Sequence, residues 1–219
     1  MTYRGPQVVD LQEISALNLA FIRLLADASE ACTLLVDVPG SLADRLASLS
    51  IKERASVAAV PFLVFSLRER DDHYWEQLCA ETVNLDLLAD AAAVSAGRAR
   101  FVSAALAFMW QMSRRNPYTL RLISGASLHW CERLAEQPLM TVIQRASSRD
   151  DLLTLRAGED HRLWSRLTST AGIDKRLRAA VQLSALQTLL FHPGTSTDPG
   201  WRSAACRSRV PTFRVADDR

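Results

Sequence analysis

Apolar residues recur every three or four positions along most of the chain, which is the spacing of one face of an α-helix. The first such segment spans residues 9–28, where Asp10 stands at the position of an N-cap. Ser41 with Asp44, and Ser50 with Glu53, have the residue types of a capping box. The pattern predicts helices over residues 9–28, 31–36, 41–47, 50–59, 71–83, 84–96, 101–112, 127–135, 138–146, 160–167 and 173–191.

Two short segments have the pattern of a β-strand instead. Residues 62–68 contain the apolar run FLVF followed by Ser-Leu-Arg, directly after Pro61. Residues 152–156, with the sequence LLTLR, alternate in the same way. We therefore expect a short strand in each place, followed by a helix that Asp71 or Asp72 caps in the first case and Asp160 in the second.

These two series of elements are related by an internal repeat. A shift of 88 positions without a gap aligns residues 34–73 with residues 122–161, and nine of the forty pairs are identical. Because two short helices, a strand, an acidic pair and a histidine follow in the same order, we infer a divergent duplication. The identical pairs are Leu34/Leu122, Arg45/Arg133, Leu46/Leu134, Ala47/Ala135, Ala58/Ala146, Leu67/Leu155, Arg68/Arg156, Asp72/Asp160 and His73/His161.

The repeat divides the chain into two copies and a tail. Copy one spans residues 1–98, copy two spans residues 99–191, and residues 192–219 form a tail rich in Pro, Ser and Gly. A tail of that composition buries little apolar surface, so we expect it to be disordered on its own. The predicted fold is mainly α, with two small pseudo-repeated helical domains that each contain a short strand.

Composition adds constraints on the class of protein. Apolar residues make up 48% of the chain and charged residues 23%, which is typical of a globular protein with a buried core. No apolar run approaches the ~18 residues that a membrane span needs. The N-terminus lacks a basic segment followed by an apolar one, so we expect a cytoplasmic protein without a membrane partner. Wide spacing favours buried free thiols at Cys32, Cys79, Cys131 and Cys206.

No pattern of catalytic residues is present. The repeated motifs Asp71-Asp72-His73 and Glu159-Asp160-His161 could suggest a metal or acid–base site, but three consecutive helical residues do not share a face. Their position favours helix capping, where carboxylates meet bare amides. Ser/His/Asp, Cys/His and glycine-rich phosphate signatures are missing as well. We therefore expect no enzymatic activity, no cofactor and no metal site.

Charge is divided unequally along the chain. Residues 1–100 carry 9 basic and 14 acidic side chains, whereas residues 101–219 carry 17 basic and 10 acidic ones. The second half is therefore the part suited to a polyanion such as DNA, although a solvated, salt-bridged face is the alternative explanation. The candidate DNA-binding residues are Arg114, Arg115, Arg121, Arg133, Arg145 and Arg149.

A further pattern covers residues 14–72 and recurs more weakly over residues 101–160. It consists of an Asn-Leu-small-aromatic helix, a turn with glycine, two short helices, and a strand-like segment that closes on Arg and Asp. The matching residues are Asn18-Leu19-Ala20-Phe21, Ala43, Leu46, Leu49, Val57-Ala58, Val64-Phe65-Ser66-Leu67-Arg68 and Asp71-Asp72. In these features the chain resembles the flagellar transcriptional activator FlhD family.

The resemblance implies a fold and a set of partners. The subunit of that family is about half the length of this chain, which implies two fused subunits that form a built-in pseudo-dimer. Family members act with a zinc-containing partner, FlhC, to bind promoter DNA and recruit RNA polymerase. This chain has no zinc-ligand set of its own, and Phe65 stands where the family has a cysteine, so we expect no crosslink between the copies.

Two hypotheses for function follow. The first is a non-enzymatic transcriptional regulator, a subunit of an activator complex that binds double-stranded DNA together with an FlhC-like partner and contacts RNA polymerase. In it, copy two offers its arginines to phosphates, while acidic copy one and apolar surface dock the partner. The alternative is a helical adaptor or assembly protein, such as a scaffold associated with secretion or conjugation, that does not bind DNA.

Overall fold

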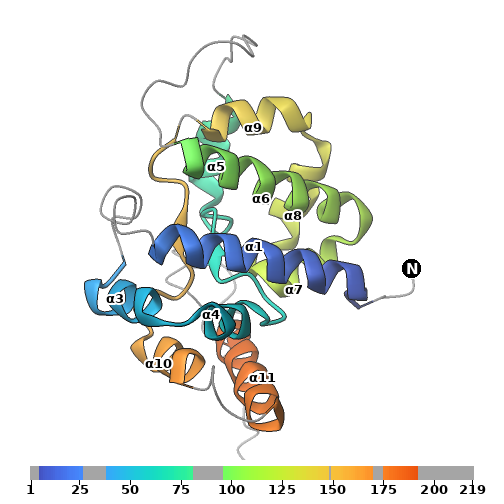
Figure 1. Cartoon of the computed structure of the whole chain (residues 1–219). Helices are drawn as coiled ribbons and strands as arrows, with labels where there is room; N and C mark the ends of the chain where they lie inside the picture. The colour runs from blue at the N-terminus through green and yellow to red at the C-terminus, as the bar shows by residue number, and fades with distance from the viewer. Residues whose placement is uncertain (1–4, 27–37, 81–95, 148, 170–174, 192–219) are drawn as a thin grey trace, which may run out of the picture.

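A computed structural model of the chain describes residues 5–26, 38–80, 96–147, 149–169 and 175–191. Within them the fold is mainly helical with one pair of short strands, as the sequence predicts (Figure 1). The elements are α1 (Val8–Ala26), α3 (Gly40–Ser48), α4 (Ile51–Ala58), β1 (Phe65–Ser66), α5 (Asp72–Ala80), α6 (Ala96–Arg115), α7 (Pro117–Ser124), α8 (Leu128–Glu136), α9 (Leu139–Ser147), β2 (Thr154–Leu155), α10 (His161–Ser169) and α11 (Lys175–Phe191).

Helices α1 and α6 form the centre of the molecule and run antiparallel to each other (Figure 1). The ring of Phe21 in α1 lies 5.6 Å from the ring of Phe101 near the start of α6. At the other end, Asp10 in the first turn of α1 forms an ion pair with Arg115, the last residue of α6. Helices α3 and α4 pack against α1, whereas α8 and α9 pack against α6. Each long helix therefore has its own pair of short helices.

The corresponding short helices of the two copies begin 88 residues apart. The pairs of starting residues are Gly40 and Leu128 for α3 and α8, and Ile51 and Leu139 for α4 and α9. This equal spacing supports the duplication that we infer from the sequence. The division of the chain between residues 98 and 99 stays a prediction, and it falls in the first turn of α6.

The two strands pair with each other, one from each copy. In this antiparallel pair Phe65 lies opposite Leu155, and Ser66 lies opposite Thr154. Ser66 and Thr154 are themselves 88 positions apart, so the approximate two-fold axis that relates the copies passes through this pair. The strands predicted over residues 62–68 and 152–156 are thus confirmed as short strands, although each is only 2 residues long.

The helix that follows each strand packs against the other copy. Helix α5 contacts α9, whereas α10 contacts α3 and α4. The rings of Trp75 in α5 and Trp130 in α8 meet edge to face with centroids 5.2 Å apart. Buried side chains from both copies belong to one hydrophobic cluster. The copies are therefore interlocked around a shared core.

After the strands, the shift between the copies changes from 88 to 89 positions. Arg68 and Ala157, which precede the turns into α5 and α10, are the non-glycine residues with positive φ in the described chain, at 54° and 50°. Nε1 of Trp75 donates to the carbonyl of Leu67, and Nε1 of Trp164 donates to the carbonyl of Arg156. One residue is therefore inserted in copy two just after β2.

This insertion corrects the gapless alignment of the sequence. The identical pairs Arg68/Arg156, Asp72/Asp160 and His73/His161 do not occupy equivalent positions in the structure. The structural equivalents 89 residues apart are instead Asp71/Asp160, Trp75/Trp164 and Leu78/Leu167, in which the aspartates cap a helix and the other four side chains are buried.

Three of the predicted helix caps are confirmed. Ser50 and Glu53 form a complete capping box at the start of α4. The carboxylate of Asp71 accepts a hydrogen bond of 3.0 Å from the N–H of Tyr74, so Asp71, not Asp72, caps α5. Asp160 caps α10 in the same way through the N–H of Leu163.

Two other predicted caps are wrong, and one helix was not predicted. Asp10 lies inside the first turn of α1, where it is buried. Helix α3 begins after Pro39 without a side-chain cap, so Ser41 has no capping role. Helix α7, which Asn116 caps, has no counterpart among the predicted helices. The helix predicted over residues 31–36, the helix predicted over residues 84–96 apart from its last residue, and the tail over residues 192–219 lie outside the described residues.

Asn18 joins α1 to the segment that leads into β1. Its Nδ2 donates to the carbonyls of Ala58 and Phe62 at 3.1 and 2.8 Å, and its Oδ1 accepts from the N–H of Val64 at 3.0 Å. The side chain is fully buried. The residue 88 positions later is Leu106, which cannot make these bonds, so this connection belongs to copy one alone.

We predict that Asn18→Ala lowers the free energy of unfolding by at least about 2 kcal/mol, because it leaves buried backbone groups without partners. Urea unfolding followed by circular dichroism measures the change. Gln12→Ala, at an exposed position of the same helix, is the control and should have a small effect. Equal stability of the two variants would contradict the role assigned to Asn18.

Candidate nucleic-acid interface

The six arginines that the sequence suggests for DNA binding are spread over several elements. Arg114 and Arg115 end α6, Arg121 lies in α7, Arg133 in α8 and Arg145 in α9, while Arg149 precedes β2. Three of them are exposed, namely Arg114, Arg115 and Arg121, and the other three are half-buried.

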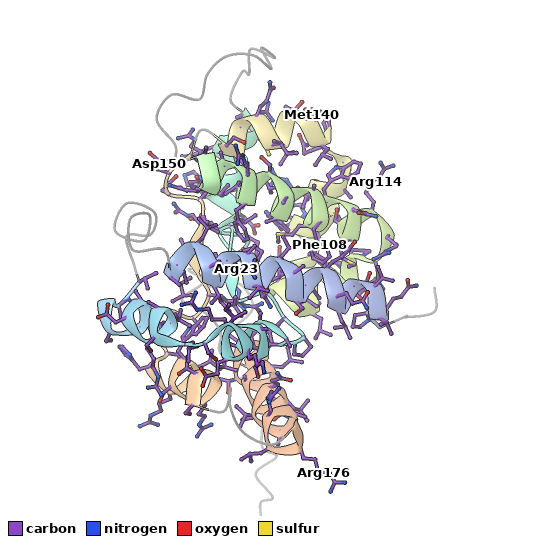
Figure 2. All side chains as sticks on the ribbon, viewed as in Figure 1. Arg23, Phe108, Arg114, Met140, Asp150 and Arg176 are labelled. Carbon is purple, nitrogen blue, oxygen red and sulfur yellow. The ribbon has the colours of Figure 1, made fainter. Side chains whose placement is uncertain are left out.

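Contacts already engage several of these side chains. Arg115 pairs with Asp10 of copy one, and Arg133 pairs with Glu76 of copy one at 3.0 Å. The guanidinium of Arg114, near the end of α6, lies 4.8 Å from the ring centroid of Trp110 (Figure 2). Two of the six arginines therefore connect the copies to each other, which is a structural role that the sequence does not reveal.

Helix α10 carries a basic face that sequence reasoning misses. Arg162 and Arg166 are four residues apart, so they share a face of the helix. Both are exposed, and α10 contains no acidic residue. The sequence does contain two arginines at helical spacing. The gapless alignment pairs His161 with His73, however, so it does not show that Arg162 and Arg166 correspond to His73 and Gln77.

The fold fixes the direction in which this basic face points. Leu163, Trp164 and Leu167 are buried on the opposite side of α10. The indole N–H of Trp164 donates to the carbonyl of Arg156 at 3.2 Å, and Asp160 caps the helix. Because these contacts prevent the helix from rotating, the two arginines are held toward solvent.

The equivalent helix of copy one has the opposite charge. With the shift of 89 positions, Arg162 and Arg166 correspond to His73 and Gln77. Helix α5 carries two carboxylates, Asp72 and Glu76, and no lysine or arginine. Its location differs as well, because α5 lies beside α9 and α10 lies at the other end of the molecule, beside α3 and α4 (Figure 1).

Another pair of arginines stabilises the end of α7. Nη1 of the buried Arg156 donates to the carbonyls of Leu63 and Ile123, and Nε of Arg70 donates to the carbonyl of Gly125 at 3.0 Å. Burial lowers the pKa of Arg156 to about 10, although the nearby Glu69 carboxylate opposes this shift. Cations suit a helix C-terminus because its last carbonyls are unpaired, so we assign these arginines to the fold.

Other groups that sequence reasoning considers for chemistry have structural surroundings. Asp71 and Asp160 act as helix caps, and His73 lies 2.9 Å from the side chain of Gln77 on an exposed face. Burial raises the pKa of the Cys131 thiol to about 12, which keeps it protonated at neutral pH. Within the described residues, no group of three His, Cys, Asp or Glu side chains is placed to hold a metal ion.

Comparisons with known proteins leave the family open. No protein-family model, no curated protein and no solved structure matches the chain. The resemblance to the FlhD family therefore rests on the residues quoted above and stays a prediction. In the part of the chain that the structure describes, no helix is both long and apolar enough to cross a membrane.

We predict that Gly125→Ala destabilises the fold by about 1–2 kcal/mol, because Gly125 has a φ of 75° that L-residues avoid. An added Cβ would also lie 2.5 Å from Nη2 of Arg70 and 2.6 Å from Nη2 of Arg156. Gly40→Ala is the matched control, since nothing lies within 4 Å of its Cβ position. Thermal unfolding compares the two, and an unchanged melting temperature for Gly125→Ala would contradict this account of the turn.

Proposed function

We propose that the chain is a non-enzymatic subunit of a DNA-binding transcriptional regulator, and that the outer face of α10 contacts DNA phosphates. The observation that carries this proposal is the charge difference between α5 and α10. These helices descend from one ancestral element and keep the same buried tryptophan and leucine, at Trp75/Trp164 and Leu78/Leu167. Their exposed sides nevertheless differ in charge, because α5 carries the carboxylates of Asp72 and Glu76 whereas α10 carries the guanidiniums of Arg162 and Arg166. We attribute this difference to what each end of the molecule binds.

The geometry of α10 suits a polyanion. Guanidinium groups bind phosphate oxygens with charge-assisted hydrogen bonds, and a helix with two arginines on one face can follow a phosphate backbone. Exposed Arg176 stands at the start of α11, which contacts α10, and its side chain points away from the molecule (Figure 2). It adds one more exposed guanidinium at this end of the molecule. Arg114, Arg121, Arg145 and Arg149 add further positive charge from copy two.

The remainder of the proposal follows the resemblance. An FlhC-like subunit with its own zinc site would supply further DNA contacts, and RNA polymerase would be recruited by the assembled complex. Helix α5 has an exposed Asp72, an exposed Glu76 that also pairs with Arg133, and no lysine or arginine, so it suits a basic surface of such a partner.

One observation favours the alternative, a helical adaptor that does not bind DNA. Arg115 and Arg133 form ion pairs with Asp10 and Glu76, so part of the positive charge of copy two serves the association of the copies. A chain whose arginines act mainly in this way needs no nucleic acid.

We predict that the full-length chain binds duplex DNA at low salt and that the affinity falls as salt rises. The double variant Arg162→Gln/Arg166→Gln should weaken binding and reduce the log–log salt slope by about 1.8, because each lost phosphate contact removes ~0.9. Fluorescence anisotropy with a labelled duplex, across a salt series, measures both quantities.

The matched control is His73→Glu/Gln77→Glu, which changes the equivalent positions of α5 and removes the same net charge. This variant should leave the salt slope unchanged. Equal weakening by both variants would mean that DNA feels only the total charge and would contradict the assignment to α10. Arg121→Gln/Arg145→Gln tests the other arginines separately. Absence of binding at low salt, both alone and with a copurifying partner, would favour the adaptor.

A further inference from the structure

The faces of α1 and α6 that point away from the core form a groove. Side chains of both helices line it, and its volume is about 360 Å³. Leu17 from α1 and Phe108 from α6 are the largest apolar side chains among its lining residues, and Phe108 lies between the two ribbons in Figure 2. No other described helix covers this side of the pair (Figure 1). The lining residues are Glu13, Ala16, Leu17, Ala107, Phe108 and Gln111.

Small residues create the groove. Ala16 and Ala20 follow one another along the outer face of α1, and Ala104 and Ala107 do the same on α6. Their methyl groups leave room for another backbone to approach, whereas longer side chains would fill the space. At one end of the α1 face stands Val9, which is 54% exposed although it is apolar. Contact between this apolar surface and water is unfavourable, and burial against a partner would remove that cost.

The charges at the ends of the groove are unequal. Because α1 and α6 are antiparallel and Phe21 meets Phe101, Arg23 and Arg100 lie at the same end. Both are exposed, and Figure 2 shows Arg23 on the outward side of α1. The opposite end has one carboxylate, Glu13, and one further guanidinium, that of Arg114. As far as the described residues go, the groove is therefore apolar in the middle and positively charged at one end.

We infer that this groove binds an amphipathic helix of a partner protein, with small apolar residues toward the groove and carboxylates at the end that meets Arg23 and Arg100. A helix is the form that fits, because two antiparallel helices with small residues allow a third to pack at the ordinary 8–10 Å. The charge at this end of the groove indicates which kind of helix it binds. A basic helix would meet two exposed guanidiniums, whereas an acidic one would neutralise them.

A second copy of this chain is a poorer occupant. Association of two such grooves around a two-fold axis would place arginines of one face near arginines of the other, with Glu13 as the only carboxylate among the lining residues. The inference about this groove is independent of DNA binding, because α10 lies in another part of the molecule.

A pair of labelled helical peptides tests the inference with the full-length chain. Each is about 18 residues long, enough to form a helix, with Leu and Ala on one face. One carries Glu at one end and the other carries Lys there. Fluorescence anisotropy should show that the Glu peptide binds at least ten-fold more tightly. Arg23→Glu/Arg100→Glu should reverse this preference.

Ala16→Trp, at an exposed position, fills the groove and should abolish binding of the Glu peptide without changing the circular dichroism spectrum. Ala47→Trp, at an exposed position of α3, is the control and should bind the peptide normally. Equal binding of both peptides, no binding of either, or binding that survives Ala16→Trp would overturn the inference. Concentration-dependent dimerisation that Ala16→Trp abolishes would show that a second copy occupies the groove. DNA affinity of Ala16→Trp, measured in parallel, separates this result from the proposed function.

Discussion

The pairing of β1 with β2 is the contact on which the arrangement of the chain depends. A ladder of two residues per strand has little stability alone, so the surrounding aromatic core must hold it. Phe65 of β1 meets the rings of Phe21 and Phe101 at 5.5 and 4.9 Å, which ties the strand to both long helices. Because Ser66 and Thr154 lie on the pseudo-two-fold axis, their pairing makes the two chain segments cross. This crossing sends α5 and α10 each to the opposite copy.

Fusion of two copies in one chain lets equivalent positions change independently. In a dimer of identical subunits, every substitution occurs twice. Here Asp10 and Arg98 occupy equivalent positions 88 residues apart, both are buried, and their charges are opposite. Asp10 pairs with Arg115, while Arg98 pairs with Asp150 at 3.2 Å. Divergence has thus reached the interior as well as the outer faces of α5 and α10, while the helix positions have stayed the same.

The success of sequence reasoning depends on how far apart the interacting residues are. The capping box of Ser50 and Glu53 is predictable because both residues lie within one turn. Asp10 resembles an N-cap in the sequence, but it lies inside the first turn, where one carboxylate oxygen accepts from the N–H of Gln7 and the other from Arg115, which is 105 positions away. The repeat identifies equivalent helices and strands, since their spacing is unchanged. It does not show the inserted residue after β2, because the gapless alignment still ends on Asp and His in both copies.

The candidate site was less predictable than the fold. Exposure decides which arginines can reach a ligand, and the sequence shows composition but not the partners of each side chain. Arg133 and Arg115 are engaged by residues of the other copy, and Arg156 is buried at the end of α7. Arg162 and Arg166 become prominent only when α10 is compared with its true equivalent, α5. The α1–α6 groove likewise cannot be predicted from the sequence, because the residues of its two walls lie about ninety positions apart in the chain.

The packing of α5 against copy two and of α10 against copy one also determines the order in which the chain can fold during synthesis. Helices α3 and α4 leave the ribosome roughly a hundred residues before α10, which covers them in the finished molecule. Part of the apolar surface of copy one therefore stays uncovered until copy two has been made. Contacts of such long sequence separation also form slowly. The last strand and the helix after it complete the fold of the first half, so a nascent chain that stops after copy one remains unfinished.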